Sequence, residues 1–195
     1  MIVYTALVAA MALVSFSYKQ EIDACFLSFT GNNLTAGQPD RLPATSEKTR
    51  TLKTEKGSVE VTRVDGYRIL YNNDKNAPFV NLKVELSDQG AYESDQKGLI
   101  DNLRYLNAQS SGMETKELIE LSFNGYKITG LSRGSIESGS TPGSFVLFPG
   151  KGVTVYFYFN NLRPGYRHFG SLEDYKKLRN QFMEEYTRHL ASCQK

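Results

Sequence analysis

The chain of 195 residues contains no tryptophan, two cysteines, two histidines and six prolines. So few cysteines and histidines exclude a cysteine-rich zinc module and a small domain held together by several disulfides. Neither charge sign dominates, because 23 Lys and Arg residues are balanced by 21 Asp and Glu residues, which leaves a net charge of +2. This balance argues against a nucleic-acid-binding protein. The glycine and proline contents also exclude a collagen-like or wholly disordered chain, so we expect one domain with a substantial core.

One long uncharged run is present, and it lies at the N-terminus between Ile2 and Ser17. As a helix it would span about 24 Å, which is short of a hydrocarbon core of about 30 Å. Ser15 and Ser17 supply small residues where a signal peptidase reads them. We therefore predict a signal peptide over residues 1–17 and a secreted or periplasmic protein that begins near Tyr18 and has no transmembrane helix. The alternative is a buried N-terminal strand or helix.

Residues 18–58 are predicted to form an N-terminal segment and a linker. Asn32 to Ser58 is rich in Thr, Ser, Pro, Asn and Lys and shows no apolar period. Cys25 precedes this linker, and Cys193 lies near the other end of the chain. We expect the two cysteines to form a disulfide, because chain termini often lie close together and export brings the protein into an oxidising compartment. Two unpaired thiols are the alternative.

Residues 59–195 are predicted to form a single domain that begins with strands. Apolar residues alternate on both sides of Asp65-Gly66, a pair typical of a tight hairpin turn. Val80, Leu82, Val84 and Leu86 then alternate with polar residues, which predicts a strand with one face in solvent.

The middle of this domain changes period twice. Apolar residues at helical spacing predict a helix over 95–109, with Ser94 as its cap. Asn124-Gly125 predicts a second hairpin, and residues 134–143 read as a loop. Residues 149–152 then form a turn between two strongly β-prone runs.

The last element predicted is an amphipathic helix from Ser171 to Leu190, capped by Ser171 with Asp174 three residues on. Its apolar stripe comprises Leu172, Tyr175, Leu178, Phe182, Met183, Tyr186 and Leu190. The predicted fold class is α+β, a twisted antiparallel β-sheet with packed α-helices. The echo of residues 65–69 in residues 124–128 suggests a duplicated ββα arrangement.

This order of elements resembles the PsbP-like fold, a group of secreted and periplasmic proteins of the PsbP and DcrB type. The resemblance rests on Asn124 to Gly130, the strand pair Phe145 to Phe159 and the closing helix Ser171 to Leu190. The Pro-Trp segment that such proteins often carry is absent, since the chain has no Trp. The resemblance implies a scaffold that binds or assists, and it transfers no site residue.

Residues with catalytic chemistry are few. The histidines are His168 and His189, and neither lies in a Gly-x-Ser-x-Gly motif. His168 precedes the last helix, where it is either an acid/base group or a solvent-facing loop residue. His189 and Cys193 share a helix face at a spacing that can hold a metal, but two ligands do not complete a site. No phosphate-binding loop is present, so we predict no cofactor and no metal.

Tyr156 and Tyr158 alternate with phenylalanines and so point to the same side of a strand. They form either a ligand-facing strip for a glycan or lipid, or part of a central strand that is buried on both faces. We expect a non-catalytic binding or accessory domain that contacts a protein or another cell-envelope component. The alternatives are a serine-type hydrolase that uses His168 with a serine from 132–144, and a lipid- or glycan-binding module.

Overall fold

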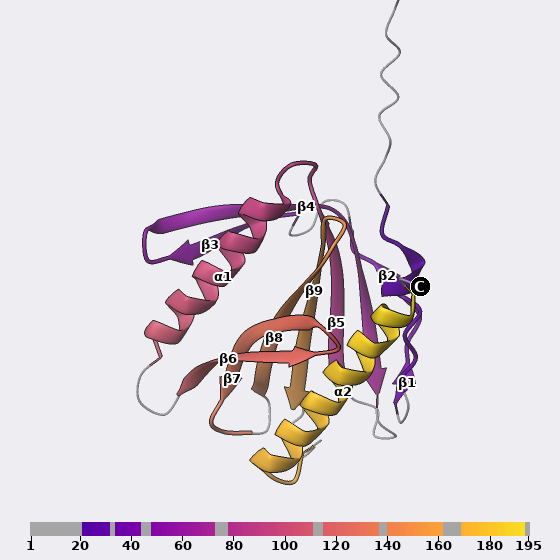
Figure 1. The fold of residues 1–195 in the computed structure, drawn as a ribbon. Helices are drawn as coiled ribbons and strands as arrows, with labels where there is room; N and C mark the ends of the chain where they lie inside the picture. The colour runs from indigo at the N-terminus through magenta and orange to yellow at the C-terminus, as the bar shows by residue number, and fades with distance from the viewer. Residues whose placement is uncertain are drawn as a thin grey trace, which may run out of the picture.

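The computed structural model describes residues 21–31, 34–43, 48–72, 78–110, 115–136, 140–161 and 169–193 (Figure 1). The predicted signal peptide, Tyr18 and His168 lie outside these residues. The elements in chain order are η1 (Ala24–Phe26), β1 (Thr35–Ala36), β2 (Asp40–Arg41), β3 (Thr49–Thr54), β4 (Gly57–Asn72), β5 (Pro78–Ser87), α1 (Tyr92–Ala108), β6 (Lys116–Phe123), β7 (Tyr126–Arg133), β8 (Ser140–Gly150), β9 (Val153–Asn161) and α2 (Leu172–Cys193).

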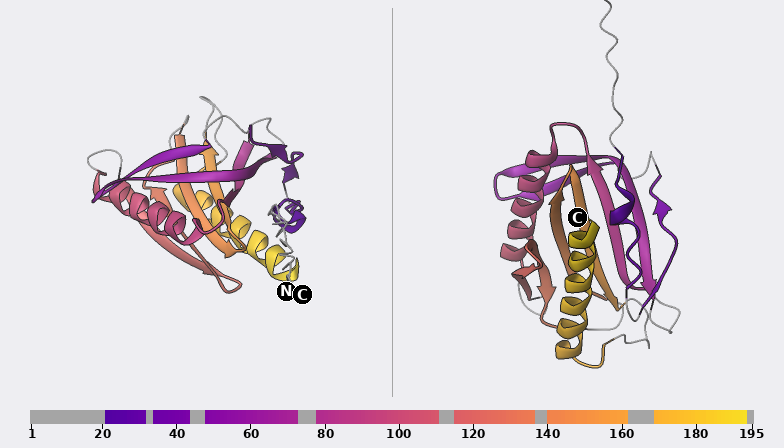
Figure 2. Two further views of the ribbon diagram at one scale, coloured as in Figure 1. Left: turned by 90° about the horizontal axis from the view of Figure 1, so that it is seen from above. Right: turned by 45° about the vertical axis from the view of Figure 1, so that its right-hand side comes forward.

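The fold is α+β, as predicted, with an antiparallel sheet in the order β1-β4-β5-β9-β8-β7-β6. Strands β2 and β3 also pair with β4. The sheet is strongly twisted, and β3 with the first half of β4 forms an arm that extends beside α1 (Figure 2). Within the described residues, no helix is long and apolar enough to cross a bilayer.

The two helices cover opposite faces of the central strand β9. Successive side chains of a strand point to opposite faces, so Tyr156 and Phe157 diverge. Phe157 packs edge-on against Phe182 and Tyr186 of α2. Tyr156 instead belongs to a smaller cluster with Leu99 of α1. The molecule therefore has two unequal layers of core, one on each face of the sheet.

The α2 layer is the larger and is built from aromatic rings. Residues buried in it include Phe145, Phe157, Phe159, Phe169, Tyr175, Phe182 and Tyr186. Helix α2 begins where the sequence predicts, because the Ser171 hydroxyl accepts a hydrogen bond from the Asp174 N–H at 3.0 Å. The prediction that Leu178 belongs to the buried apolar stripe is wrong. Leu178 is 36% exposed, since it lies at the margin of the face that contacts the sheet.

The hairpin turn predicted at Asp65-Gly66 is wrong. Strand β4 continues through both residues, and Gly66 pairs with Glu85 of β5. A bulge between Arg63 and Asp65 bends the strand there without reversing it. The true hairpin lies one strand earlier, where Thr54 pairs with Gly57. The predicted linker is therefore wrong at β3, which belongs to this hairpin and has one large apolar side chain, Leu52, to mark it.

Residues 65–69 and 124–128, whose similar sequences suggest a duplication, do not adopt the same structure. Asn124 and Gly125 form the turn between β6 and β7 with positive φ angles of 51° and 83°, which confirms that hairpin. Asp65 and Gly66 lie inside a strand, so the sequence echo joins two different conformations. The predicted turn at 149–152 is confirmed between β8 and β9, and β8 begins at Ser140, inside the predicted loop.

Helix α1 begins earlier than predicted, at Tyr92. Its cap residue is Ala91, whose methyl side chain cannot accept a hydrogen bond. The predicted cap Ser94 lies inside the helix and donates to the Ala91 carbonyl at 2.7 Å. The helix lies close to the β3–β4 arm at Gly98, where an added Cβ would approach Val59 to 2.9 Å. A larger residue at this position would force the arm outward.

The N-terminal segment is fixed to α2 by a disulfide and by buried contacts. Cys25 and Cys193 are bonded, with their Cα atoms 6.1 Å apart across 168 positions of sequence. Nearby, the Tyr186 hydroxyl donates to the Phe26 carbonyl at 3.1 Å. The Tyr71 hydroxyl donates to the Phe29 carbonyl at 2.9 Å. Phe26 and Phe29 of this segment are therefore part of the α2 core layer.

Candidate functional site

A pocket of about 210 Å³ lies between α1 and the sheet face opposite α2. Its walls come from α1, from β3 and from the adjacent strands β8 and β9. Most of its lining is apolar, and one arginine, one asparagine, one serine and two tyrosines add polar groups. The residues that define it are Arg50, Leu52, Leu99, Asn102, Leu103, Leu106, Ser144, Phe145, Val146, Tyr156 and Tyr158. An apolar pocket with a few converging polar groups is the usual form of a small-molecule site.

Tyr156 and Tyr158 form one wall of the pocket. Their side chains share a face because they are two residues apart on β9. Their rings lie nearly parallel, with centroids 6.3 Å apart and an interplanar angle of 4°. Tyr156 is 4% exposed, whereas Tyr158 is partly exposed. The structure thus places both predicted tyrosines at the pocket, one at its base and one towards its rim.

Arg50 brings a positive charge to this wall. It is on β3, and its Nη2 donates to the Glu85 carboxylate at 2.5 Å and to the Tyr156 hydroxyl at 2.8 Å. Its guanidinium carbon lies 5.0 Å from the centre of the Tyr156 ring. The Glu85 side chain is 5% exposed and that of Arg50 is 21% exposed. The ion pair is therefore shielded from water on the carboxylate side and open towards the pocket on the arginine side.

The protonation of Tyr156 is fixed by this environment. Burial raises the pKa of its hydroxyl well above the ordinary value, and the nearby Glu85 charge raises it further. Arg50 opposes both effects but doesn't cancel them. Tyr156 therefore remains a neutral phenol at physiological pH and acts as a hydrogen-bonding wall of the pocket.

The polar face of β5 continues beneath α1. The sequence predicts the face with Asn81, Lys83 and Glu85 to be in solvent, and that prediction is wrong for Glu85, which is 4% exposed. The next residue on this face, Ser87, is also buried. Helix α1 and the β3–β4 arm cover this part of the strand. Asp95 of α1 is also buried there, and its Oδ2 has no hydrogen-bond partner among the described residues. Burial raises the pKa of the Asp95 carboxyl, although a hydrogen bond from Ser87 partly offsets the shift.

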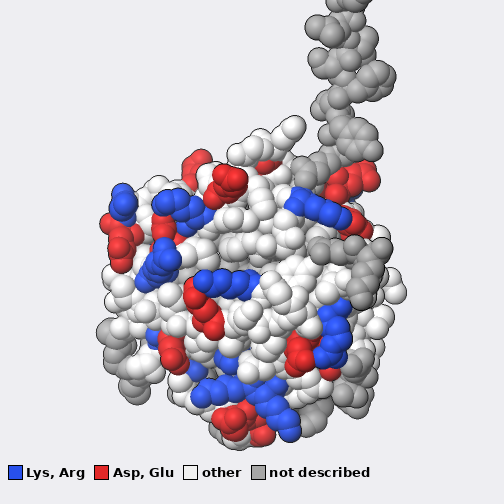
Figure 3. Space-filling view, in the orientation of Figure 1, with Lys and Arg blue, Asp and Glu red and all other residues white. Residues whose placement is uncertain are grey.

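A second and larger cleft, of about 480 Å³, lies between α1 and the β6–β7 hairpin. Its cations are already matched by carboxylates on the surface. Lys97 lies 2.7 Å from Asp101, and Lys127 lies 2.8 Å from Glu120. Both signs of charge are interspersed over the face shown in Figure 3, so that face offers no broad patch of one sign. Exposed pairs of this kind contribute little to affinity, and we regard the smaller pocket as the better site.

Two of the serines considered as nucleophiles, Ser132 and Ser144, lie in different settings. Ser132 is 3% exposed, and its hydroxyl donates to Tyr175 at 3.3 Å on the α2 side of the sheet. Ser144 lines the pocket. His168 lies outside the described residues. His189 is on the opposite side of the sheet from the pocket, where its Nε2 lies 3.0 Å from the Cys25 carbonyl.

Arg50 is the site residue that sequence reasoning missed. It falls in the stretch predicted as a linker, where it reads as one of several basic residues. A signal is nevertheless present, because Arg50, Leu52 and Thr54 alternate with outward-facing residues.

No protein-family model matches the chain, and no match was found among curated proteins or solved structures. The PsbP-like resemblance therefore stays an expectation from the sequence alone. The pocket geometry is the main guide to function.

Proposed function

We propose that this chain is a non-catalytic binding domain whose pocket beneath α1 holds a small amphiphilic carboxylate. The observation that carries the proposal is the position of Arg50, a partly exposed arginine at the edge of an apolar pocket with two tyrosines beside it. This setting combines a charged recognition group with a surface that excludes water.

The apolar part of the ligand would contact leucines and tyrosine rings. Leu99 and Leu103 are 6% and 8% exposed, so the pocket floor is largely removed from solvent. Leu52 and Leu106 are partly buried and close the sides. A short acyl chain or an aromatic ring would replace water along this lining, which favours binding by about 25 cal/mol for each Å² of apolar surface covered.

The carboxylate of the ligand would meet Arg50. Within the described residues, the hydrogen bonds that Arg50 donates to Glu85 and Tyr156 both use Nη2. These bonds leave Nη1 for another acceptor. Lys83 adds positive charge nearby, with its Nζ 5.8 Å from the centre of the Tyr158 ring. A carboxylate is therefore favoured over a neutral group of the same shape.

Binding without catalysis is supported by the character of the polar groups. Arg50 stays protonated and cannot act as a general base. Tyr156 has its pKa raised, which disfavours the tyrosinate that a nucleophile would require. Glu85 already accepts a hydrogen bond from Arg50. The pocket is better suited to hold a carboxylate than to transform one.

The proposed place of action is outside the cytoplasm, in a secreted or periplasmic setting with a cell-envelope component as the source of the ligand. The uncharged run before Tyr18 and the disulfide between Cys25 and Cys193 both support this compartment. Intact-mass analysis of native material tests it, with an N-terminus near Tyr18 expected. A retained Met1 in a cytosolic fraction would contradict export.

Matched pairs of small molecules test the binding proposal. Octanoate and hydrocinnamate should bind in ligand-observed NMR, and their amides should bind more weakly by about tenfold, or about 1.4 kcal/mol. Leu106→Trp should fill the pocket and abolish binding, whereas Leu178→Trp on the exposed margin of α2 should leave it unchanged.

A double variant tests the role of Arg50 without leaving the Glu85 carboxylate buried and unpaired. Arg50→Met with Glu85→Gln removes both partners and should erase the preference for carboxylate over amide. Arg104→Met, an exposed position on the other side of α1, is the control. Equal binding of acids and amides to the wild-type protein would reject the proposal, as would binding that survives Leu106→Trp.

A further inference from the structure

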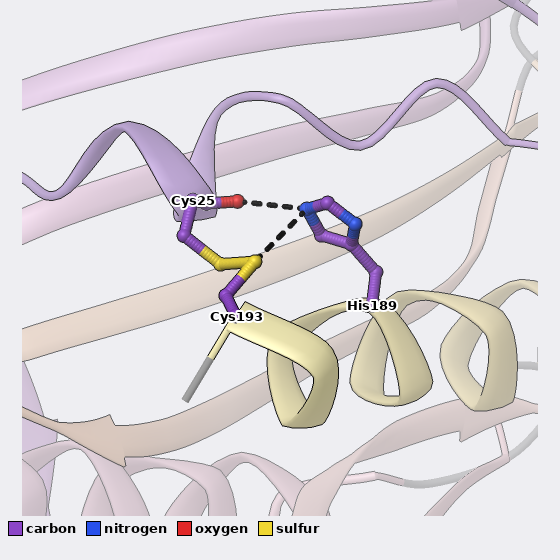
Figure 4. A group of neighbouring side chains, drawn as sticks. All are labelled: Cys25, His189 and Cys193. Carbon is purple, nitrogen blue, oxygen red and sulfur yellow. Dashed lines mark hydrogen bonds between the residues drawn. A yellow bond between two sulfur atoms is a disulfide. The ribbon is translucent and has the colours of Figure 1, made fainter. Parts of the chain in front are cut away.

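The disulfide lies next to a histidine at the C-terminal end of α2. Cys193 is the last residue of that helix, and His189 is one turn earlier on the same face. Cys25 approaches from the short helix η1, as Figure 4 shows. The three residues come from the two ends of the described chain. The sequence alone predicts that two of them, His189 and Cys193, share a helix face.

The distance between His189 and Cys193 is that of two ligands in a metal site. His189 Nε2 lies 3.7 Å from Cys193 Sγ. The three potential ligand atoms all lie within 4.8 Å of one another. In a tetrahedral zinc site with bonds of about 2.0 Å to nitrogen and 2.3 Å to sulfur, ligand atoms are about 3.5–3.8 Å apart. The histidine–cysteine pair already has this spacing.

We propose that Cys25, His189 and Cys193 form a zinc site when the disulfide is reduced. The two sulfurs must separate from bonding distance to about 3.8 Å, which rotation of the cysteine side chains can provide. Two thiolates and one imidazole are a ligand set that zinc prefers, and three protein ligands leave a fourth position for water or a ligand.

The change of state is a balanced exchange. A dithiol reductant gives two electrons to the sulfur–sulfur bond, each cysteine sulfur takes up one proton, and the reductant becomes a disulfide. Zinc then replaces the two thiol protons, which are released to solvent, and binds the neutral imidazole of His189. Oxidation by a disulfide oxidant reverses both steps and expels the metal.

The histidine is held in place in the oxidised state. Its Nε2 contacts the Cys25 carbonyl at 3.0 Å, and because a carbonyl only accepts, Nε2 must carry the proton in that bond. The imidazole also lies 5.6 Å from the Phe29 ring. Zinc binding through Nε2 requires the other tautomer, with the proton on Nδ1, so the metal would break this hydrogen bond.

A cleft of about 380 Å³ opens on His189 on this side of α2. His189 lines the cleft together with Ser28, Glu185, Arg188 and Ser192. The Ser28 hydroxyl lies 3.3 Å from His189 Nε2, close enough to contact a metal-bound water. Of the three proposed ligands only His189 lines this cleft, so the histidine is the side from which a metal ion would approach.

Cobalt provides the direct test, because thiolate-to-cobalt charge transfer reports sulfur ligation in a tetrahedral site. Protein reduced with a phosphine and kept anaerobic should bind one Co²⁺ per chain with such a band, and Zn²⁺ should displace it. The oxidised protein should show no band. His189→Gln should weaken binding by more than about tenfold. Ser192→Ala lines the same cleft and should leave the affinity unchanged.

Circular dichroism and urea control for loss of structure on reduction. The folded, reduced chain should bind cobalt, and the same chain in urea should bind it much more weakly, because the fold brings the ligands together. Zinc should also raise the melting temperature of the reduced protein and not that of the oxidised one. Absence of the band, equal affinity for the His189→Gln variant, or a reduced chain that zinc fails to order would overturn the proposal.

Discussion

Arg50 donates a hydrogen bond to the Tyr156 hydroxyl at 2.8 Å, across 106 positions of sequence. The same guanidinium nitrogen donates to Glu85, so the bond links the β3–β4 arm to the two central strands of the sheet. Helix α1 packs beside this link. The relationship makes the arm part of the pocket wall and ties the binding site to the stability of the arm.

The Arg50–Glu85 pair gives a prediction about stability. Arg50→Met alone leaves the Glu85 carboxylate buried without its partner and should lower the free energy of unfolding by about 3 kcal/mol. The double variant Arg50→Met/Glu85→Gln should lose less than the sum of the two single variants. Urea unfolding measures all three. Additive losses would show that the two side chains are not coupled.

Phe182 should be essential to the α2 layer. It is 3% exposed and packs against Tyr71, Phe157 and Phe159. Phe182→Ala should cost about 3–5 kcal/mol of unfolding free energy, because the cavity cannot be filled by its rigid neighbours. Leu178→Ala on the same helix is the matched control and should cost under about 1 kcal/mol. Similar losses for both would mean that α2 packs by a different face.

The stability of the fold should depend on the charge of Asp95. Its raised pKa means that the native state holds this proton more tightly than the unfolded state. Stability attributable to this group is therefore fully present at pH below the unfolded pKa and is lost as pH rises through the folded pKa. Asp95→Asn should be more stable than the wild type at neutral pH, and the difference should shrink on acidification. Chemical unfolding across this pH range is the measurement, and a difference that is constant with pH would exclude the effect.

The disulfide should contribute strongly to stability because it closes a long loop. In the chain-entropy model, linking positions 168 residues apart stabilises by about 5 kcal/mol, and measured values are often smaller. Cys25→Ser/Cys193→Ser should therefore lower the melting temperature markedly while keeping the sheet. Non-reducing peptide mapping of native material should recover the two cysteine peptides joined. Two freely alkylated thiols would contradict the bridge.

Local signals in the sequence predicted the parts of the fold that depend on local conformation. Asn124-Gly125 was sufficient for a hairpin because both residues must adopt positive φ there. The helical spacing of apolar residues and the serine cap predicted helix α2 and its first residue in the same way. The hairpin turn predicted at Asp65-Gly66 is wrong because pairing with β5 sets the conformation of these residues, and no local sequence pattern indicates that pairing.

The pocket could be predicted only in part for the same reason. Tyr156 and Tyr158 were visible as a pair on one face of a strand. Arg50 was not, because β3 has little apolar content and acquires its structure from β4 and α1. The polar face of β5 has the pattern of an exposed face, and only the packing of α1 and the arm over it shows that it is interior.

Amide chemical-shift mapping with octanoate tests the central claim most directly. Titration into the isotope-labelled protein should shift the amides of α1 around Leu99 to Leu106 and those of β9 around Tyr156 to Tyr158. The shifts should saturate, and octanamide at the same concentrations should produce much smaller ones. Shifts confined to the charged cleft at Lys97, Arg104 and Lys127, or no saturable shifts at all, would contradict a carboxylate pocket beneath α1.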